Sequence, residues 1–180
     1  MPTQNQQGTQ VPEQTSTSQS LSTSPASGDN YIQPGSNYEI VNIANGNRLD
    51  IAGANEGSSA TTKPSNGTKH QNFQFAPTGI VPDQYFIVCQ VSSNRFLDGI
   101  NGPGEGNVFS NGQKAYPGLP QEYHNMNQRW RLIPVDGREH NYQIVNAQND
   151  RFLEVRGENV VASPLKTNDP NAQLWWINRR

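Results

Sequence analysis

The chain has few of the features that several large protein classes require. Its single cysteine, Cys89, excludes an internal disulfide framework in a chain of 180 residues. The 13 basic and 15 acidic side chains give a formal charge of −2, so there is no basic field to attract nucleic acid or an anionic membrane. No run approaches the roughly 20 apolar residues that span a bilayer. We therefore expect no nucleic-acid partner and no membrane insertion.

The first 30 residues contain no aromatic side chain, no lysine and no arginine. Gln, Ser, Thr and Pro dominate, so this segment has too little apolar surface to offset the entropy lost on ordering. It also lacks the basic start and apolar stretch of a secretion signal and the arginines of a mitochondrial presequence. We expect a disordered tail at residues 1–35, followed by one domain at residues 36–180, in a cytoplasmic protein.

One short pattern occurs three times after this tail. Each copy opens with Tyr-x-Ile-Val, then has an acidic residue directly after a Leu, and closes on Gln-x-aromatic-x-apolar. The opening tyrosines are Tyr38, Tyr85 and Tyr142, the acids are Asp50, Asp98 and Glu154, and the closing glutamines are Gln71, Gln128 and Gln173. Internal repetition predicts one domain with threefold internal pseudo-symmetry, with repeats at about residues 36–82, 83–139 and 140–180.

The hydrophobic pattern within the repeats has a period of two. In residues 128–132 the Gln, Trp and Leu share one face and two arginines share the other, which is typical of a strand with a buried side and a wet side. Residues 142–145 and 152–155 favour two more strands, with a turn signal at residues 149–150. Helix patterns are nearly absent. The pattern therefore predicts an all-β fold, a closed antiparallel barrel without exposed edges.

The order Tyr-x-Ile-Val, Leu-Asp and Gln-x-Trp, repeated over residues 36–180, resembles the ricin B-chain type β-trefoil lectin family. Within that family the sequence is most similar in character to the cysteine-poor, unsecreted lectins of fungi and bacteria. The resemblance implies a β-trefoil and a lectin that recognises galactose-type glycans or glycoproteins through a weak site. Trefoils of this kind also include protease inhibitors, so the alternative is a protein-binding trefoil that acts on a protein target through its loops.

The resemblance also implies which residues contact a sugar. In that family the acid after Leu accepts hydrogen bonds from sugar hydroxyls, a suitable role for a carboxylate. The residue before the motif Gln, commonly Asn, makes a second contact, and a tryptophan between them stacks on the sugar. The second repeat matches at Asp98 and Asn127, with Gln128 as a brace for Asp98. No aromatic falls at the stacking position near Asn111, so the ring is expected from the long loop between Gly99 and Asn125, whose tyrosines are Tyr116 and Tyr123.

The other two repeats match less well. The first has Asp50 and Gln71, with His70 at the second contact position and no aromatic in its loop. The third has Glu154, which we expect to pair with Arg151 or Arg156 instead of a sugar. The predicted binding residues are therefore Asp98, Asn127, Gln128, Tyr116 and Tyr123 in the second repeat and Asp50, His70 and Gln71 in the first.

The remaining marked residues favour structural roles. Phe73, Trp130 and Trp175 are predicted to fill the core, because the motif aromatic lies on the buried face of its strand. Cys89, inside a strand predicted at residues 85–91, is interpreted as a small buried residue. The three histidines have no Ser or Cys motif near them, and no group has zinc-ligand spacing. We expect no enzyme activity, no metal and no cofactor.

Overall fold

The structure is a computed structural model that describes residues 32–92, 94–99, 105–113, 124–135 and 137–180. The predicted tail, up to residue 31, and the tyrosines Tyr116 and Tyr123 lie outside the described residues. No helix in the described ranges is long and apolar enough to cross a membrane.

Each sequence repeat contributes four strands and one short 3-10 turn to the described structure. The strands are β1 (Tyr38–Asn42), β2 (Arg48–Ile51), β3 (Ser58–Lys63), β4 (Phe73–Pro77), β5 (Gln84–Cys89), β6 (Phe96–Gly99), β7 (Gly106–Asn111), β8 (Arg129–Pro134), β9 (Asn141–Asn146), β10 (Phe152–Arg156), β11 (Asn159–Ser163) and β12 (Trp175–Arg179). The turns are η1 (Lys69–Gln71), η3 (Met126–Gln128) and η4 (Pro170–Gln173).

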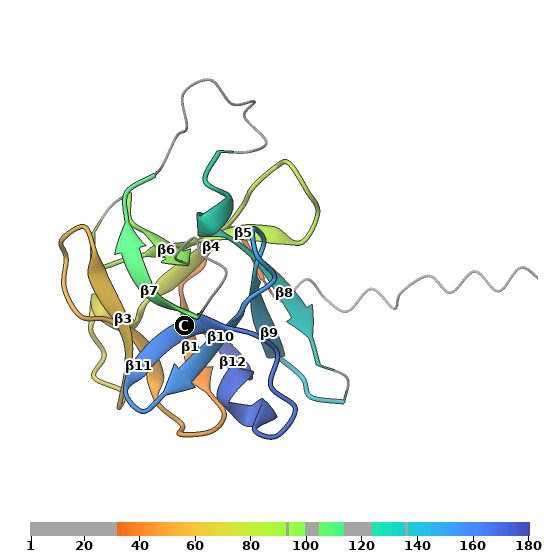
Figure 1. Cartoon of the computed structure of the whole chain (residues 1–180). Helices are drawn as coiled ribbons and strands as arrows, with labels where there is room; N and C mark the ends of the chain where they lie inside the picture. Colours follow the sequence, from red (N-terminus) through yellow and green to blue (C-terminus); the bar gives the residue numbers. More distant parts are fainter. Residues whose placement is uncertain (1–31, 93, 100–104, 114–123, 136) are drawn as a thin grey trace, which may run out of the picture. The chain divides into compact units, whose positions relative to one another are not determined.

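Six of the strands close into an antiparallel barrel. The ring runs from β1 through β4, β5, β8, β9 and β12 and returns to β1. Figure 1 shows β1 beside β12, the last strand of the chain, and the two pair from Tyr38 with Arg179 to Asn42 with Trp175. The closed ring leaves no unpaired barrel edge, and it confirms the predicted all-β barrel.

The other six strands form three hairpins that meet one another. The hairpins are β2–β3, β6–β7 and β10–β11, one from each repeat. Their second strands pair mutually: β3 with β7, β7 with β11, and β11 with β3. The two strands of a hairpin are therefore fixed both by each other and by the hairpins of the other repeats.

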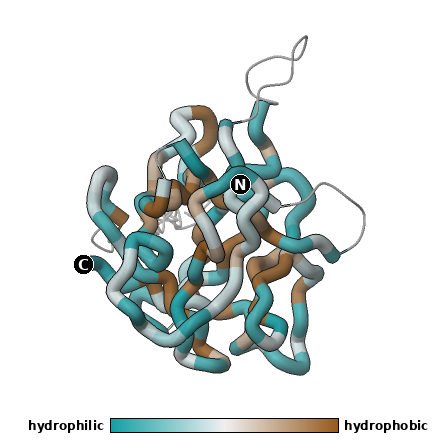
Figure 2. Tube along the Cα trace, turned by 90° about the vertical axis from the view of Figure 1, so that its left-hand side faces the viewer, coloured by the Kyte–Doolittle hydropathy of each residue, from teal (hydrophilic) through white to brown (hydrophobic). Residues whose placement is uncertain are grey.

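One motif aromatic from each repeat fills the core. Phe73, Trp130 and Trp175 have no exposed surface, which confirms their predicted role. The two indoles also satisfy backbone carbonyls: Trp130 Nε1 donates to Leu97 O at 2.9 Å and Trp175 Nε1 donates to Leu153 O at 2.8 Å. Apolar and polar stretches alternate along the trace in Figure 2, as expected for strands with one buried side.

Two local expectations are wrong. The predicted loop from Gly99 to Asn125 contains a strand, β7, because residues 106–111 pair with β6 in the second hairpin. Arg129, expected on a wet face, is only 3% exposed. Its guanidinium donates through Nη2 to the backbone oxygen of His124, so the chain before η3 lies over that face of β8.

We predict that Trp130→Ala lowers the free energy of unfolding by about 3–5 kcal/mol, because it removes a fully buried ring and leaves a cavity. Urea unfolding measures the loss. Trp176→Ala is the control: Trp176 is 38% exposed on β12, and its replacement should cost less than about 1 kcal/mol. A Trp130→Ala protein as stable as wild type would contradict the core assignment.

Candidate functional site

Each hairpin carries one buried carboxylate on its first strand. Asp50 on β2 is 1% exposed, Asp98 on β6 is 2% exposed and Glu154 on β10 is 1% exposed. The glutamine that ends the 3-10 turn of the same repeat donates to this carboxylate. The pairs are Gln71 with Asp50 at 3.2 Å, Gln128 with Asp98 at 3.1 Å and Gln173 with Glu154 at 3.1 Å. The expected brace between Gln128 and Asp98 is confirmed and recurs in all three repeats.

The same glutamine amide also holds the segment that follows the hairpin. Its Nε2 donates a second bond to a backbone carbonyl, Pro64 O at 2.9 Å, Gly112 O at 2.7 Å or Pro164 O at 2.7 Å. In two repeats Oε1 accepts a backbone N–H, from Asn66 at 3.0 Å and from Lys166 at 2.9 Å. The motif glutamine therefore ties the acid, the 3-10 turn and the loop between them into one unit.

A third contact comes from the last residue of the hairpin's second strand. Lys63, Asn111 and Ser163 stand opposite Arg48, Phe96 and Phe152, two residues before each acid. Lys63 Nζ lies 3.2 Å from Asp50 Oδ1, Asn111 Nδ2 donates to Asp98 Oδ2 at 2.9 Å, and Ser163 Oγ donates to Glu154. These donors are not evident from sequence spacing, because strand register brings them to the acid.

The second repeat gathers three side-chain amides around its acid. Asn127 donates to Asp98 Oδ1, while Asn111 and Gln128 donate to Oδ2. The structure thus brings together Asp98, Asn127 and Gln128 of the predicted set. Asn111 also accepts the N–H of Gly57 at 3.0 Å, which connects this cluster to the first hairpin.

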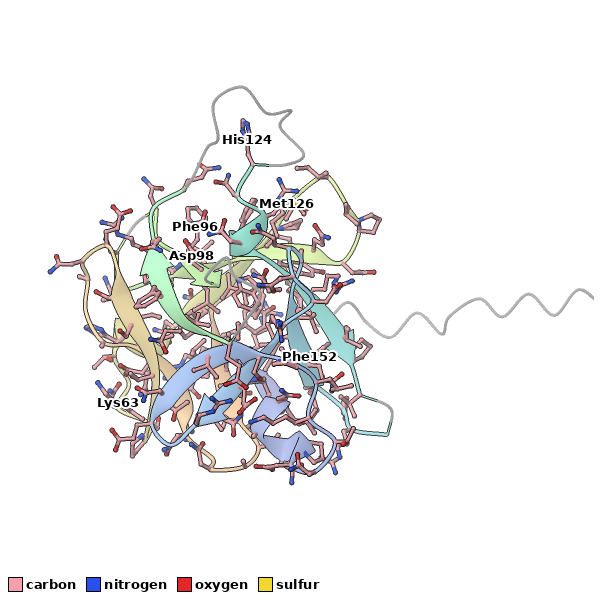
Figure 3. All side chains as sticks on the ribbon, viewed as in Figure 1. Lys63, Phe96, Asp98, His124, Met126 and Phe152 are labelled. Atoms are coloured by element: carbon pink, nitrogen blue, oxygen red, sulfur yellow. The ribbon has the colours of Figure 1, made fainter. Side chains whose placement is uncertain are left out.

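Two rings lie on the same face of the second hairpin as Asp98. Phe109 is the cross-strand partner of Asp98, and Phe96 is the partner of Asn111, so all four side chains point to one side of the hairpin. Both rings are half-buried. Figure 3 shows Phe96 and Asp98 on β6, near Met126 of η3. No aromatic falls at the stacking position in the sequence, but the strand register brings Phe96 and Phe109 beside the acid.

In the first repeat a lysine takes part in the acid's hydrogen-bonding shell. Asp50 contacts Lys63 and Gln71, so the predicted pair of Asp50 and Gln71 is brought together. His70 Nδ1 lies 2.6 Å from the backbone oxygen of Ile51. The imidazole of His70 is therefore held beside the strand that carries Asp50, by a backbone contact.

In the third repeat two cations and two neutral donors surround the acid. Glu154 accepts bonds from Lys166, from Arg156 at 3.1 Å, from Ser163 and from Gln173. The expected ion pair with Arg156 is confirmed. Burial raises the pKa of Glu154, but the hydrogen bonds from Lys166, Ser163, Arg156 and Gln173 outweigh it and hold the pKa below its usual value.

The single thiol is inert. Cys89 is 1% exposed at the end of β5, and burial raises its pKa to about 12. The prediction that it is a small buried residue is confirmed. In the described part of the chain no three His, Cys, Asp or Glu side chains are close enough together to hold a metal ion.

Several solved structures have a similar fold. A designed threefold-symmetric protein, ThreeFoil, matches with a TM-score of 0.64 at 22% identity, over 79% of this chain and 97% of that one. A ricin B-like lectin of Macrolepiota procera, solved in complex with lactose, matches with a TM-score of 0.62 at 19% identity, over 83% and 99%. The Rhizoctonia solani agglutinin matches with a TM-score of 0.64 at 16% identity, over 82% and 97%.

The chain has the ricin B-type β-trefoil lectin fold. This confirms the resemblance at the level of fold. No protein-family model and no curated protein matches the sequence itself.

We predict that Glu154 makes stability depend on acid pH. Because its folded pKa is lowered, its carboxylate stabilises the fold above the unfolded pKa, about 4.3, and this contribution is lost as the pH falls through the folded value. The stability gap between wild type and Glu154→Gln should therefore shrink when urea unfolding is repeated from about pH 6 down to about pH 3. Glu158→Gln, at an exposed turn position, should keep the wild-type slope. A constant gap for Glu154→Gln would be the contrary result.

Proposed function

We propose that this protein is a carbohydrate-binding, lectin-like module and that the second repeat carries its best site. The observation behind the proposal is the convergence of Asn111, Asn127 and Gln128 on Asp98. The acid, the Asn and the Gln that the family resemblance requires of a sugar site thus occur together. The lactose bound to the similar Macrolepiota procera lectin supports a galactose-type ligand.

The burial of Asp98 determines how a sugar reaches it. Because Asp98 is only 2% exposed, its carboxylate can accept a hydrogen bond from a sugar hydroxyl only when one of the surrounding amides is displaced. Asn111 is the amide most easily displaced, because it lies at the end of β7 and is only partly buried. The exchange replaces one charge-assisted hydrogen bond with another, so the net gain is small. We expect weak affinity, about 1 mM, or about −4 kcal/mol.

The rings beside Asp98 provide the apolar part of the site. The C–H face of a pyranose packs well on an aromatic ring. Phe96 and Phe109 flank the acid on the same face of the hairpin. The tyrosines Tyr116 and Tyr123 remain candidates for the same contact.

The threefold pseudo-symmetry expected from the repeats gives each hairpin one potential site. Asp50, Gln71 and His70 form the second candidate site. There the ammonium of Lys63 lies 3.2 Å from Asp50, and His70 stands where the second repeat has Asn127, so this repeat fits the family pattern less well. Glu154, held by Lys166 and Arg156, is assigned a structural role. We propose a binding function without catalysis.

The alternative function is binding of a protein target, and one observation favours it. The loop between β4 and β5 exposes two adjacent apolar side chains, Ile80 at 42% and Val81 at 46%. Exposed apolar residues on a loop suit a protein contact. This loop differs from the Tyr-containing loop on which the sequence analysis based the alternative.

We predict that Asp98→Ala abolishes lactose binding, because loss of a charge-assisted hydrogen-bond acceptor costs about 1.5–3 kcal/mol, or about 10-fold to 150-fold in affinity. NMR titration of the full chain with lactose measures it. Glu154→Ala is the matched control and should bind as wild type does, and Asp50→Ala, in the second candidate site, should lose less affinity than Asp98→Ala.

Loss of binding in Asp50→Ala alone would move the site to the first repeat. If wild type binds lactose and all three variants retain binding, these acids are not sugar acceptors. The protein-target alternative would be favoured if the wild-type protein binds no glycan on an array but binds a protease.

A further inference from the structure

The three hairpins share an arrangement of side chains that lies outside the repeated motif. In each hairpin the acid faces a residue on the second strand, and this residue in turn faces a residue of another hairpin. The three rows are Asp50–Thr61–Asn159, Asp98–Phe109–Ser59 and Glu154–Val161–Asn107. Because cross-strand partners point to the same side of a sheet, the side chains of a row lie on one face. Each row therefore leads from a carboxylate across two strand spacings, about 10 Å, into another repeat.

The far ends of the three rows meet at one hollow. Ser59, Asn107 and Asn159 occupy corresponding positions, four residues before the last residue of β3, β7 and β11. These strands pair with one another, and Figure 1 shows them side by side. The three residues line a hollow of about 110 Å³, together with Ala60, Val108 and Val160. We call it the junction hollow.

The junction hollow has polar residues at its rim and apolar residues at its floor. The three polar residues are exposed, whereas Ala60, Val108 and Val160 are at most 2% exposed. One hydroxyl and two side-chain amides can donate to and accept from hydroxyl groups, and none of the described lining residues carries a charge. The hollow is smaller than the roughly 300 Å³ of a site that encloses a whole small molecule. It therefore fits one edge of a neutral, hydroxyl-bearing ring.

The middle residue distinguishes the second row from the other two. It is Phe109, where the other rows have Thr61 and Val161. Phe109 is half-buried, so part of its ring is accessible between Asp98 and Ser59. An aromatic ring at this place can support the C–H face of a sugar. The second row thus joins an acid, a ring and the polar rim of the junction hollow in one line.

We infer that the junction hollow is a second subsite of the proposed lectin site, and that the second repeat binds a neutral disaccharide or a longer neutral glycan. This inference rests on the proposed function. The first sugar unit lies on Asp98, the chain passes over Phe109, and the second unit places hydroxyl groups on Ser59 and Asn159. The site is composite, because Asp98 and Phe109 come from the second repeat, Ser59 from the first and Asn159 from the third.

The test compares lactose with methyl β-galactoside by NMR titration of the full chain. Both ligands carry a β-linked galactose, but only lactose has a second ring. Lactose should bind about 5-fold more tightly, which corresponds to about one net hydrogen bond. It should also shift the amides of residues 58–60, 106–108 and 159–161, which methyl β-galactoside should leave in place. Equal affinities without these shifts would overturn the inference and leave the proposed function intact.

Two variants remove polar groups from the rim of the junction hollow. Ser59→Ala and Asn159→Ala should each weaken lactose binding about 3-fold and leave the affinity for methyl β-galactoside unchanged. Ser58→Ala is the matched control, because Ser58 faces the other side of β3 and its Oγ donates to Asn55 O at 2.7 Å. It should keep the wild-type preference for lactose. A preference that is unchanged in both Ser59→Ala and Asn159→Ala would contradict the second subsite.

Asp98→Ala separates the two subsites. It should abolish binding of both ligands, whereas Ser59→Ala should affect lactose alone. Wild type that binds neither ligand refutes the proposed function and the inference with it, while wild type that binds both equally refutes the inference alone. Thermal unfolding of each variant shows whether a loss of binding reflects a loss of fold.

Discussion

The bond between the motif glutamine and the acid of its repeat is the contact on which the three units depend. A carboxylate that is 1–2% exposed needs hydrogen-bond donors, because burial without them would be costly. The glutamine provides one donor to the carboxylate and a second to the backbone of the following loop. Each 3-10 turn ends at the glutamine, whose amide contacts the carboxylate of the hairpin. The aromatic residue two positions later is buried in the core. Core packing and acid placement are therefore set by the same few residues.

Around this shared contact the described donors differ between the repeats. In the third repeat Lys166 and Arg156 hold Glu154 in ion pairs, and breaking a buried pair leaves an uncompensated charge. In the second repeat three side-chain amides, from Asn111, Asn127 and Gln128, donate to Asp98. In the first repeat one lysine and one amide contact Asp50. These different donors are a physical reason to expect binding and structural roles to be divided among related positions.

Much of the fold was predictable from the sequence, because it follows from repetition and from a period of two. The barrel, the buried motif aromatics and the Gln128 brace are of this kind. What could not be predicted depends on strand register. Lys63, Asn111 and Ser163 reach the acids because hairpin pairing puts them opposite residues 48, 96 and 152. Spacing alone does not reveal this: the donor is 13 residues after Asp50 and Asp98 but 9 after Glu154.

The burial of Arg129 is a second feature that the sequence pattern does not predict. Strand alternation puts it on the outer face of the barrel, and that much is right. A side chain on the outer face becomes buried when a neighbouring segment folds over it, and here the chain before η3 does so, with the His124 carbonyl as the guanidinium's acceptor. The exposure of an outer-face residue in this fold therefore depends on the loops that cross the barrel wall as well as on strand alternation.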